Sequence, residues 1–97
     1  MRRRNNPDAN QAAIVDALRA IGAIVFLIGQ PFDLLCALRG KLYLLEVKNP
    51  DGKDKLEDSQ KRDILRLNLV GVDVRVVRSV EEAIQCLYTN CTSSGSV

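Results

Sequence analysis

The apolar residues of this chain recur at two spacings, one typical of helices and the other of strands. Three segments have helical spacing, namely residues 8–21, 56–70 and 80–88. Three segments are apolar runs of strand length, namely residues 23–28, 34–38 and 42–47, and residues 72–77 alternate and then turn apolar, as a strand entering a sheet would. Glycine or proline follows several of these segments, as expected at turns. The pattern therefore predicts the order helix, strand, strand, strand, helix, strand, helix in one α/β domain.

Capping signals support the ends of the helices. Asn6 followed by Pro7 predicts the start of the first helix, because Asn caps a helix well and Pro suits its first position. Ser79, with Glu82 three residues later, forms a capping box for the last helix. We expect that helix to run to about Tyr88, followed by a frayed tail rich in Ser and Thr.

The second and third strands are predicted to form a hairpin. Arg39-Gly40 lies between the two apolar runs, and a Gly in the second position of a two-residue loop suits a type I′ turn. If Leu38 pairs with Lys41 across that turn, the numbers of paired residues add up to a constant. Because the strands are so uniformly apolar, we expect helices to pack on both faces of the sheet.

This register brings three charged residues together at one end of the sheet. It sets Asp33 opposite Glu46, and Lys48 shares a face with Glu46 because alternate residues of a strand point the same way. Two like charges about 4 Å apart repel by about 4 kcal/mol at an effective dielectric constant near 20. A divalent cation with oxygen ligands would offset this repulsion. The alternative is a purely structural ion-pair cluster in which Lys48 supplies the compensating charge.

Composition limits the chemistry that the chain can perform. Its 97 residues suffice for one domain with a modest core, and no apolar run approaches the ~20 residues of a membrane span. The chain has no His, so a zinc site of usual composition, Ser-His-Asp catalysis and a His general base are all excluded. The basic N-terminus lacks the apolar core of a signal peptide, and we expect a cytoplasmic protein with reduced cysteines.

The net charge of +2 says little about partners, but the cations are unevenly distributed. Arg2, Arg3 and Arg4 form a basic arm over residues 1–7, which either contacts phosphates or is simply solvated. Further candidate phosphate contacts are Lys53, Lys55, Lys61 and Arg62. A charged, turn-rich loop follows Lys48 and is interpreted either as a mobile segment that touches substrate or as an ordinary solvated loop.

Pro31-Phe32-Asp33, a spacer of 12 residues and Glu46-Val47-Lys48 resemble the signature of PD-(D/E)XK nucleases. Lys55-Leu56, followed by Gln60, is similar to the virus-type replication-repair nuclease (VRR-NUC) branch of that superfamily, as is Val76 to Ala83 near the end. The resemblance spans residues 8–88. It implies a small restriction-endonuclease-like α-β-β-β-α-β-α sandwich around a central mixed sheet.

The resemblance also implies roles for individual residues. Asp33, Glu46 and the backbone carbonyl of Val47 would bind Mg2+ or Mn2+, Lys48 would assist the attacking water, and Gln60 would lie near the catalytic centre. Related nucleases often carry a Glu in the first helix, which this chain lacks. Either Asp8 or Asp16 takes its place, or water does.

The implied activity is metal-dependent hydrolysis of DNA by an endonuclease in replication, repair or recombination. Stand-alone relatives suggest branched DNA or a Holliday junction as substrate, a homodimer as the active form, and a bacterium or phage as the source. No segment of the sequence identifies a dimer interface. The alternative is a catalytically degenerate nucleic-acid-binding module of a larger assembly, and a further one is a structural protein with an incidental acidic hairpin.

Overall fold

The computed structural model describes residues 7–95, with side-chain surroundings for residues 9–88. Its elements are α1 Pro7–Ala20, β1 Ile24–Leu27, β2 Leu34–Leu38, β3 Lys41–Val47, α2 Asp58–Leu69, β4 Asp73–Val77 and α3 Val80–Gly95. This is the predicted order of helices and strands. No helix within the described residues is long and apolar enough to cross a membrane.

The four strands form one mixed sheet in the order β1-β2-β3-β4. The first three strands pair antiparallel, whereas β4 pairs parallel with β3, so α2 is the crossover connection between them. The predicted fold class, an α/β sandwich with a central mixed sheet, is therefore confirmed.

The hairpin between β2 and β3 has the predicted turn and register. Arg39 and Gly40 both have positive φ, at 56° and 81°, as a type I′ turn requires. Leu38 pairs with Lys41, and Leu34 pairs with Leu45 at the other end of the ladder. Continuing this register by one residue places Asp33 opposite Glu46.

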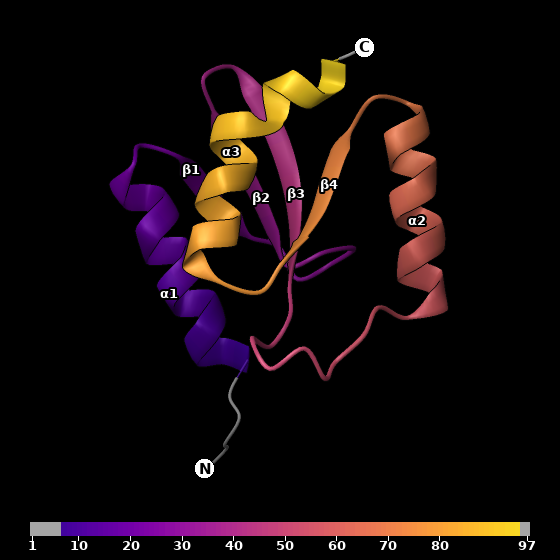
Figure 1. The fold of residues 1–97 in the computed structure, drawn as a ribbon, viewed down its shortest axis with the longest axis horizontal. Helices are drawn as coiled ribbons and strands as arrows, with labels where there is room; N and C mark the ends of the chain where they lie inside the picture. Colours follow the sequence, from indigo (N-terminus) through magenta and orange to yellow (C-terminus); the bar gives the residue numbers. More distant parts are fainter. Residues whose placement is uncertain (1–6, 96–97) are drawn as a thin grey trace.

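The hydrophobic core lies between one face of the sheet and the helices α1 and α3, which stand on the same side in Figure 1. Alternate residues of each strand point into it, and Ile14 and Leu18 of α1 are fully buried against them, as predicted. The sheet contributes Val25, Leu34, Cys36, Tyr43, Leu45, Val47 and Val77. Burial raises the pKa of the Cys36 thiol to about 11, which suits its role as a core residue.

The other face of the sheet is covered less completely than the sequence predicted. Helix α2 lies on that side, where it packs against β4 (Figure 1). Ile24, Phe26 and Leu42 remain more than half exposed. Helices do flank both faces, but one crossover helix is too narrow to cover four strands.

The last helix is longer than expected, because it extends to Gly95 instead of ending near Tyr88. No proline interrupts residues 88–95, so nothing in the backbone forces an earlier end. Its start agrees with the prediction, since the Glu82 backbone N–H donates to Ser79 Oγ at 3.1 Å. The side chains of residues 89–97, which form the predicted tail, lie outside the described residues.

Candidate active site

Asp33 is held directly before the start of β2 by a short, closed loop. The backbone N–H groups of Ile28 and Gly29 both donate to the Asp33 carbonyl, at 3.0 and 3.2 Å. The neighbouring Phe32 side chain is buried and anchors the loop. Asp33 Oδ2 in turn accepts a hydrogen bond of 2.9 Å from the Val47 backbone N–H. One carboxylate oxygen thus orients the side chain toward the end of β3.

Glu46 is a buried carboxylate with two partners. It is 6% exposed, the only charged residue among the buried side chains of the described chain. Lys48 Nζ lies 3.3 Å from Glu46 Oε2, and Gln60 Nε2 donates to the same oxygen at 2.8 Å. A buried charge needs such partners, since its removal from water is otherwise very costly. The structure therefore brings Lys48 and Gln60 to Glu46, and the hairpin register sets Asp33 opposite it. Their roles at an active site stay a prediction.

The amide of Gln60 also caps helix α2. Its Oε1 accepts a hydrogen bond of 3.1 Å from the Glu57 backbone N–H, just before the helix begins. Because the oxygen is used for capping, the nitrogen has to point away from the helix end and toward Glu46. Helix initiation and carboxylate orientation are therefore coupled through one side chain.

A polar cleft of about 280 Å³ opens at these residues. It is bounded by the loop before β2, the end of β3 and the first two turns of α2, and its lining includes Asp33, Glu46 and Gln60. The sequence reading missed Glu57, Ser59 and Asp63, which also line it. Glu57 and Asp63 stand three residues on either side of Gln60, so helical spacing could have identified both.

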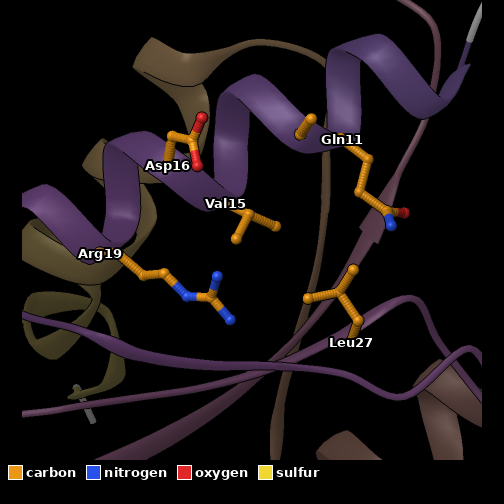
Figure 2. Close-up of a pocket in the computed structure, with 6 residues that line it drawn as sticks. Gln11, Val15, Asp16, Arg19 and Leu27 are labelled. Atoms are coloured by element: carbon orange, nitrogen blue, oxygen red, sulfur yellow. The ribbon is translucent and has the colours of Figure 1, made fainter.

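Helix α1 contributes a structural contact at the site, and its described carboxylate, Asp16, does not line the cleft. Asn10 Nδ2 donates to the Lys48 carbonyl at 2.9 Å and to the Arg78 carbonyl at 3.2 Å, which ties the ends of β3 and β4 together. Asp16 instead lines a separate cleft between α1 and β1, with Arg19 and Leu27 (Figure 2). The surroundings of the Asp8 side chain lie outside the described residues.

The charged loop after Lys48 is tied down at its middle. Arg78 donates to the Asn49 carbonyl at 2.8 Å, to Asp54 Oδ1 at 3.0 Å and to the Asp54 carbonyl at 2.9 Å. The Asn49 backbone N–H also donates to the Asp54 carboxylate. Partial burial alone would raise the pKa of Asp54, but these hydrogen bonds and the Arg78 charge outweigh it and hold the pKa below 3.8.

The candidate phosphate-binding residues are only partly placed. Arg2, Arg3 and Arg4 lie outside the described residues. Lys61 and Arg62 are exposed on α2 directly after Gln60, and Lys53 and Lys55 are exposed on the tied loop.

The donor set fits a hard divalent cation. Among the described residues, Asp33 Oδ1 and Glu46 Oε1 carry no hydrogen bond, while the second oxygen of each carboxylate is held in place. Carboxylate oxygens are the ligands that Mg2+ prefers, and it usually takes one or two of them and keeps several waters. Among all the described residues, no group of three or more Asp, Glu, His or Cys side chains could hold a metal.

The fold and the site can be compared with known proteins. No protein-family model matches the sequence, and no curated protein matches it. A solved structure of a VRR_NUC domain does match, with a TM-score of 0.70 and 26% sequence identity over 84% of this chain and 92% of that one. The chain is therefore similar, in its α/β fold and over most of its length, to a VRR_NUC domain.

Proposed function

We propose that this chain is a metal-dependent DNA endonuclease. The observation that carries the proposal is that Asp33, Glu46 and Gln60 line one polar cleft, with Lys48 paired to Glu46 beside it. The likeness to a VRR_NUC domain supports the same activity from an independent direction.

Asp33 and Glu46 would hold Mg2+ or Mn2+ through Oδ1 and Oε1, the carboxylate oxygens that make no hydrogen bond to the described residues. The Val47 backbone carbonyl would be a further ligand. When bound, such an ion lowers the pKa of a coordinated water and stabilises charge on the scissile phosphate. Lys48, only 12% exposed, holds a positive charge beside Glu46 and is placed to orient the attacking water or to neutralise developing charge. Gln60 is a positioning residue, since it fixes the orientation of the Glu46 carboxylate.

The first test is cleavage of labelled DNA with and without Mg2+ or Mn2+, comparing the natural chain with Glu46→Gln. We expect cleavage that requires the ion and falls by at least 100-fold in the variant, because an amide is a much poorer ligand than a carboxylate. Glu81→Gln, at an exposed position of α3, is the matched control and should cleave normally. Full metal-dependent activity in Glu46→Gln would refute the site assignment.

For the substrate we propose branched DNA, such as a flap or a four-way junction, cut by a homodimer in replication, repair or recombination in a bacterial or phage-infected cytoplasm. The size of the domain supports this, since 97 residues cannot envelop a duplex, whereas two copies place two sites at a fixed spacing. Linear, flapped and four-way substrates of equal length compared in one assay rank the candidates. Equal rates on all three would contradict structure specificity.

A second candidate is a nucleic-acid-binding module with a degenerate site. The observation that favours it is that no residue of α1 between 9 and 20, the part of the helix whose side chains are described, lines the cleft that holds Asp33 and Glu46. Tight binding to DNA without cleavage under either metal ion would support this candidate and refute the endonuclease.

A further inference from the structure

One face of the sheet is an uncovered apolar surface. Ile24 and Phe26 of β1 and Leu42 of β3 are 59%, 57% and 60% exposed. The strand register places all three on the face that carries Glu46, opposite the core. Ala37 pairs with Ile24 and Leu42, and Leu35 pairs with Phe26 and Leu44, so the surface is continuous across three strands. We call these six residues the open face.

Helix α2 has a second apolar stripe besides the one toward its own sheet. Ile64 and Leu67 are half-buried on the inner side, whereas Leu65 and Leu69 are 62% and 78% exposed. At 3.6 residues per turn, Leu69 lies nearly opposite Leu67, and Leu65 lies one turn before Leu69. Val70, at the end of the helix, is also exposed. We call Leu65, Leu69 and Val70 the outer stripe.

The open face and the outer stripe lie at opposite edges of the same side of the sheet. The open face starts at β1, the edge strand, whereas α2 packs beside β4, the other edge strand. A two-fold axis along the strand direction, in front of this side, exchanges the two edges. It would set the outer stripe of each copy against the open face of the other, which is the reciprocal contact of an isologous dimer.

We propose that the open face is the homodimer interface of this protein and that the outer stripe of the second copy covers it. Each sheet then has helices over its whole width on both sides, as uniformly apolar strands require. A hollow of about 420 Å³ on the same side, with Leu35, Leu42 and Leu44 in its lining, provides space for partner side chains.

The available area suits a dimer of this kind. The open face and the outer stripe together keep six large apolar side chains more than half exposed, namely Ile24, Phe26, Leu42, Leu65, Leu69 and Val70. At about 100 Å² each they amount to on the order of 600 Å² per copy. A standard interface buries about 800 Å² per partner, including its polar rim.

The proposed axis has a consequence for the candidate active site. Because it runs along the strands, it keeps equivalent strand ends at the same end of the dimer. Both clefts would then open at one end, while Leu42, near the hairpin turn, lies about 13 Å along β3 from Glu46. The dimer leaves both clefts accessible and presents them side by side to one DNA molecule. The interface itself does not depend on nuclease activity.

Sedimentation equilibrium, at protein concentrations from micromolar to millimolar, measures the mass of the particle in solution. We expect the mass of two chains for the natural protein, and of one chain for both Phe26→Lys and Leu69→Lys. Leu27→Lys is the matched control, because Leu27 has the same 57% exposure on the same strand but lies on the opposite face (Figure 2). It should remain dimeric. Circular dichroism establishes that each variant is folded.

Cross-linking distinguishes the proposed contact from other dimers. In a background with Cys86 and Cys91 replaced by Ser, Phe26→Cys combined with Leu69→Cys should give a covalent dimer under oxidation, whereas Phe26→Cys alone should not. A cross-link through Phe26→Cys alone would indicate that β1 pairs with its own copy and would overturn the proposal. So would a natural protein that is monomeric at every concentration, or a dimer that survives Leu69→Lys. None of these measurements involves cleavage, so a negative result would overturn the proposed interface without contradicting the endonuclease proposal.

Discussion

Gln60 links two parts of the candidate site through a single amide. Its oxygen caps α2 at the Glu57 N–H, and its nitrogen donates to the buried carboxylate of Glu46. An isosteric carboxylate could still cap the helix, because Glu is favoured at this position. It could not donate to Glu46, so the two functions of Gln60 can be separated by substitution.

We expect Gln60→Glu to lower both stability and activity. The new carboxylate would face Glu46 across a 2.8 Å contact, and a buried acceptor that loses its donor costs about 1–3 kcal/mol. Denaturant unfolding measures that loss, and the rate of DNA cleavage should fall at least about tenfold. Asn68→Asp adds the same charge at an exposed position of α2 and serves as the control. Unchanged stability in Gln60→Glu would show that the bond to Glu46 does not hold the carboxylate.

At the scale of elements, the loop between β3 and α2 is held by the residue that follows β4. Arg78 binds both Asn49 and Asp54, and Asn10 of α1 joins the same strand ends through the Lys48 carbonyl. The segment that follows Lys48 is therefore tied to β4 at two points. This arrangement limits how far Lys48 and the exposed cations of the loop can move relative to Glu46.

The tie between Asp54 and Arg78 should weaken in acid. Because the folded-state pKa of Asp54 lies below its ordinary value of 3.8, the ionised carboxylate stabilises the folded state at pH values above 3.8, and this contribution is lost as the pH falls through the folded pKa. We expect Asp54→Asn to be less stable than the natural chain by up to about 1 kcal/mol at pH 7, since the pair is partly exposed.

Urea unfolding of both proteins at pH 7 and at pH 2.5 measures the difference. The difference should become smaller at the lower pH, because the contribution of the ionised carboxylate is lost as the pH falls through the folded pKa. Arg78→Gln should lose at least as much stability at pH 7, because it also removes the hydrogen bonds to the Asn49 and Asp54 carbonyls. A difference that stays constant with pH would mean that the charge of Asp54 does not contribute to the tie.

At the scale of the whole molecule, charge is placed unevenly between the two ends of β3. Lys61 and Arg62 stand on the first turns of α2 beside the cleft, whereas Lys41 lies at the opposite end of β3, paired with Asp73 at 3.7 Å. If DNA binds at the cleft, Lys61 and Arg62 meet its phosphates, whereas Lys41 does not.

We therefore expect Lys61→Ala combined with Arg62→Ala to weaken DNA binding and to flatten its salt dependence. Each lost phosphate contact reduces the slope of log K against log salt by about 0.9, so the double variant should lose about 1.8. Fluorescence anisotropy over a salt series measures the slope. Lys41→Ala is the control and should leave it unchanged. Equal effects of the two variants would show that DNA does not bind preferentially at the cleft.

Much of the site followed from local rules that act over a few residues. The positive φ values of Arg39 and Gly40 set the hairpin register, and that register alone placed Glu46 opposite Asp33. Helical spacing likewise puts Gln60 on the same side of α2 as the half-buried Ile64 and Leu67. Turn geometry and side-chain alternation depend on neighbouring residues, which a sequence displays directly.

The sequence by itself determined the order of the elements, the mixed sheet and the meeting of Asp33, Glu46 and Lys48. Only the tertiary structure decided that Asp16 lies away from the cleft, that Arg78 ties the loop, and that β1 to β3 keep an open face. These features depend on where a helix or a strand end lies relative to residues far along the chain. Such distances result from packing of the whole domain, and no local pattern encodes them.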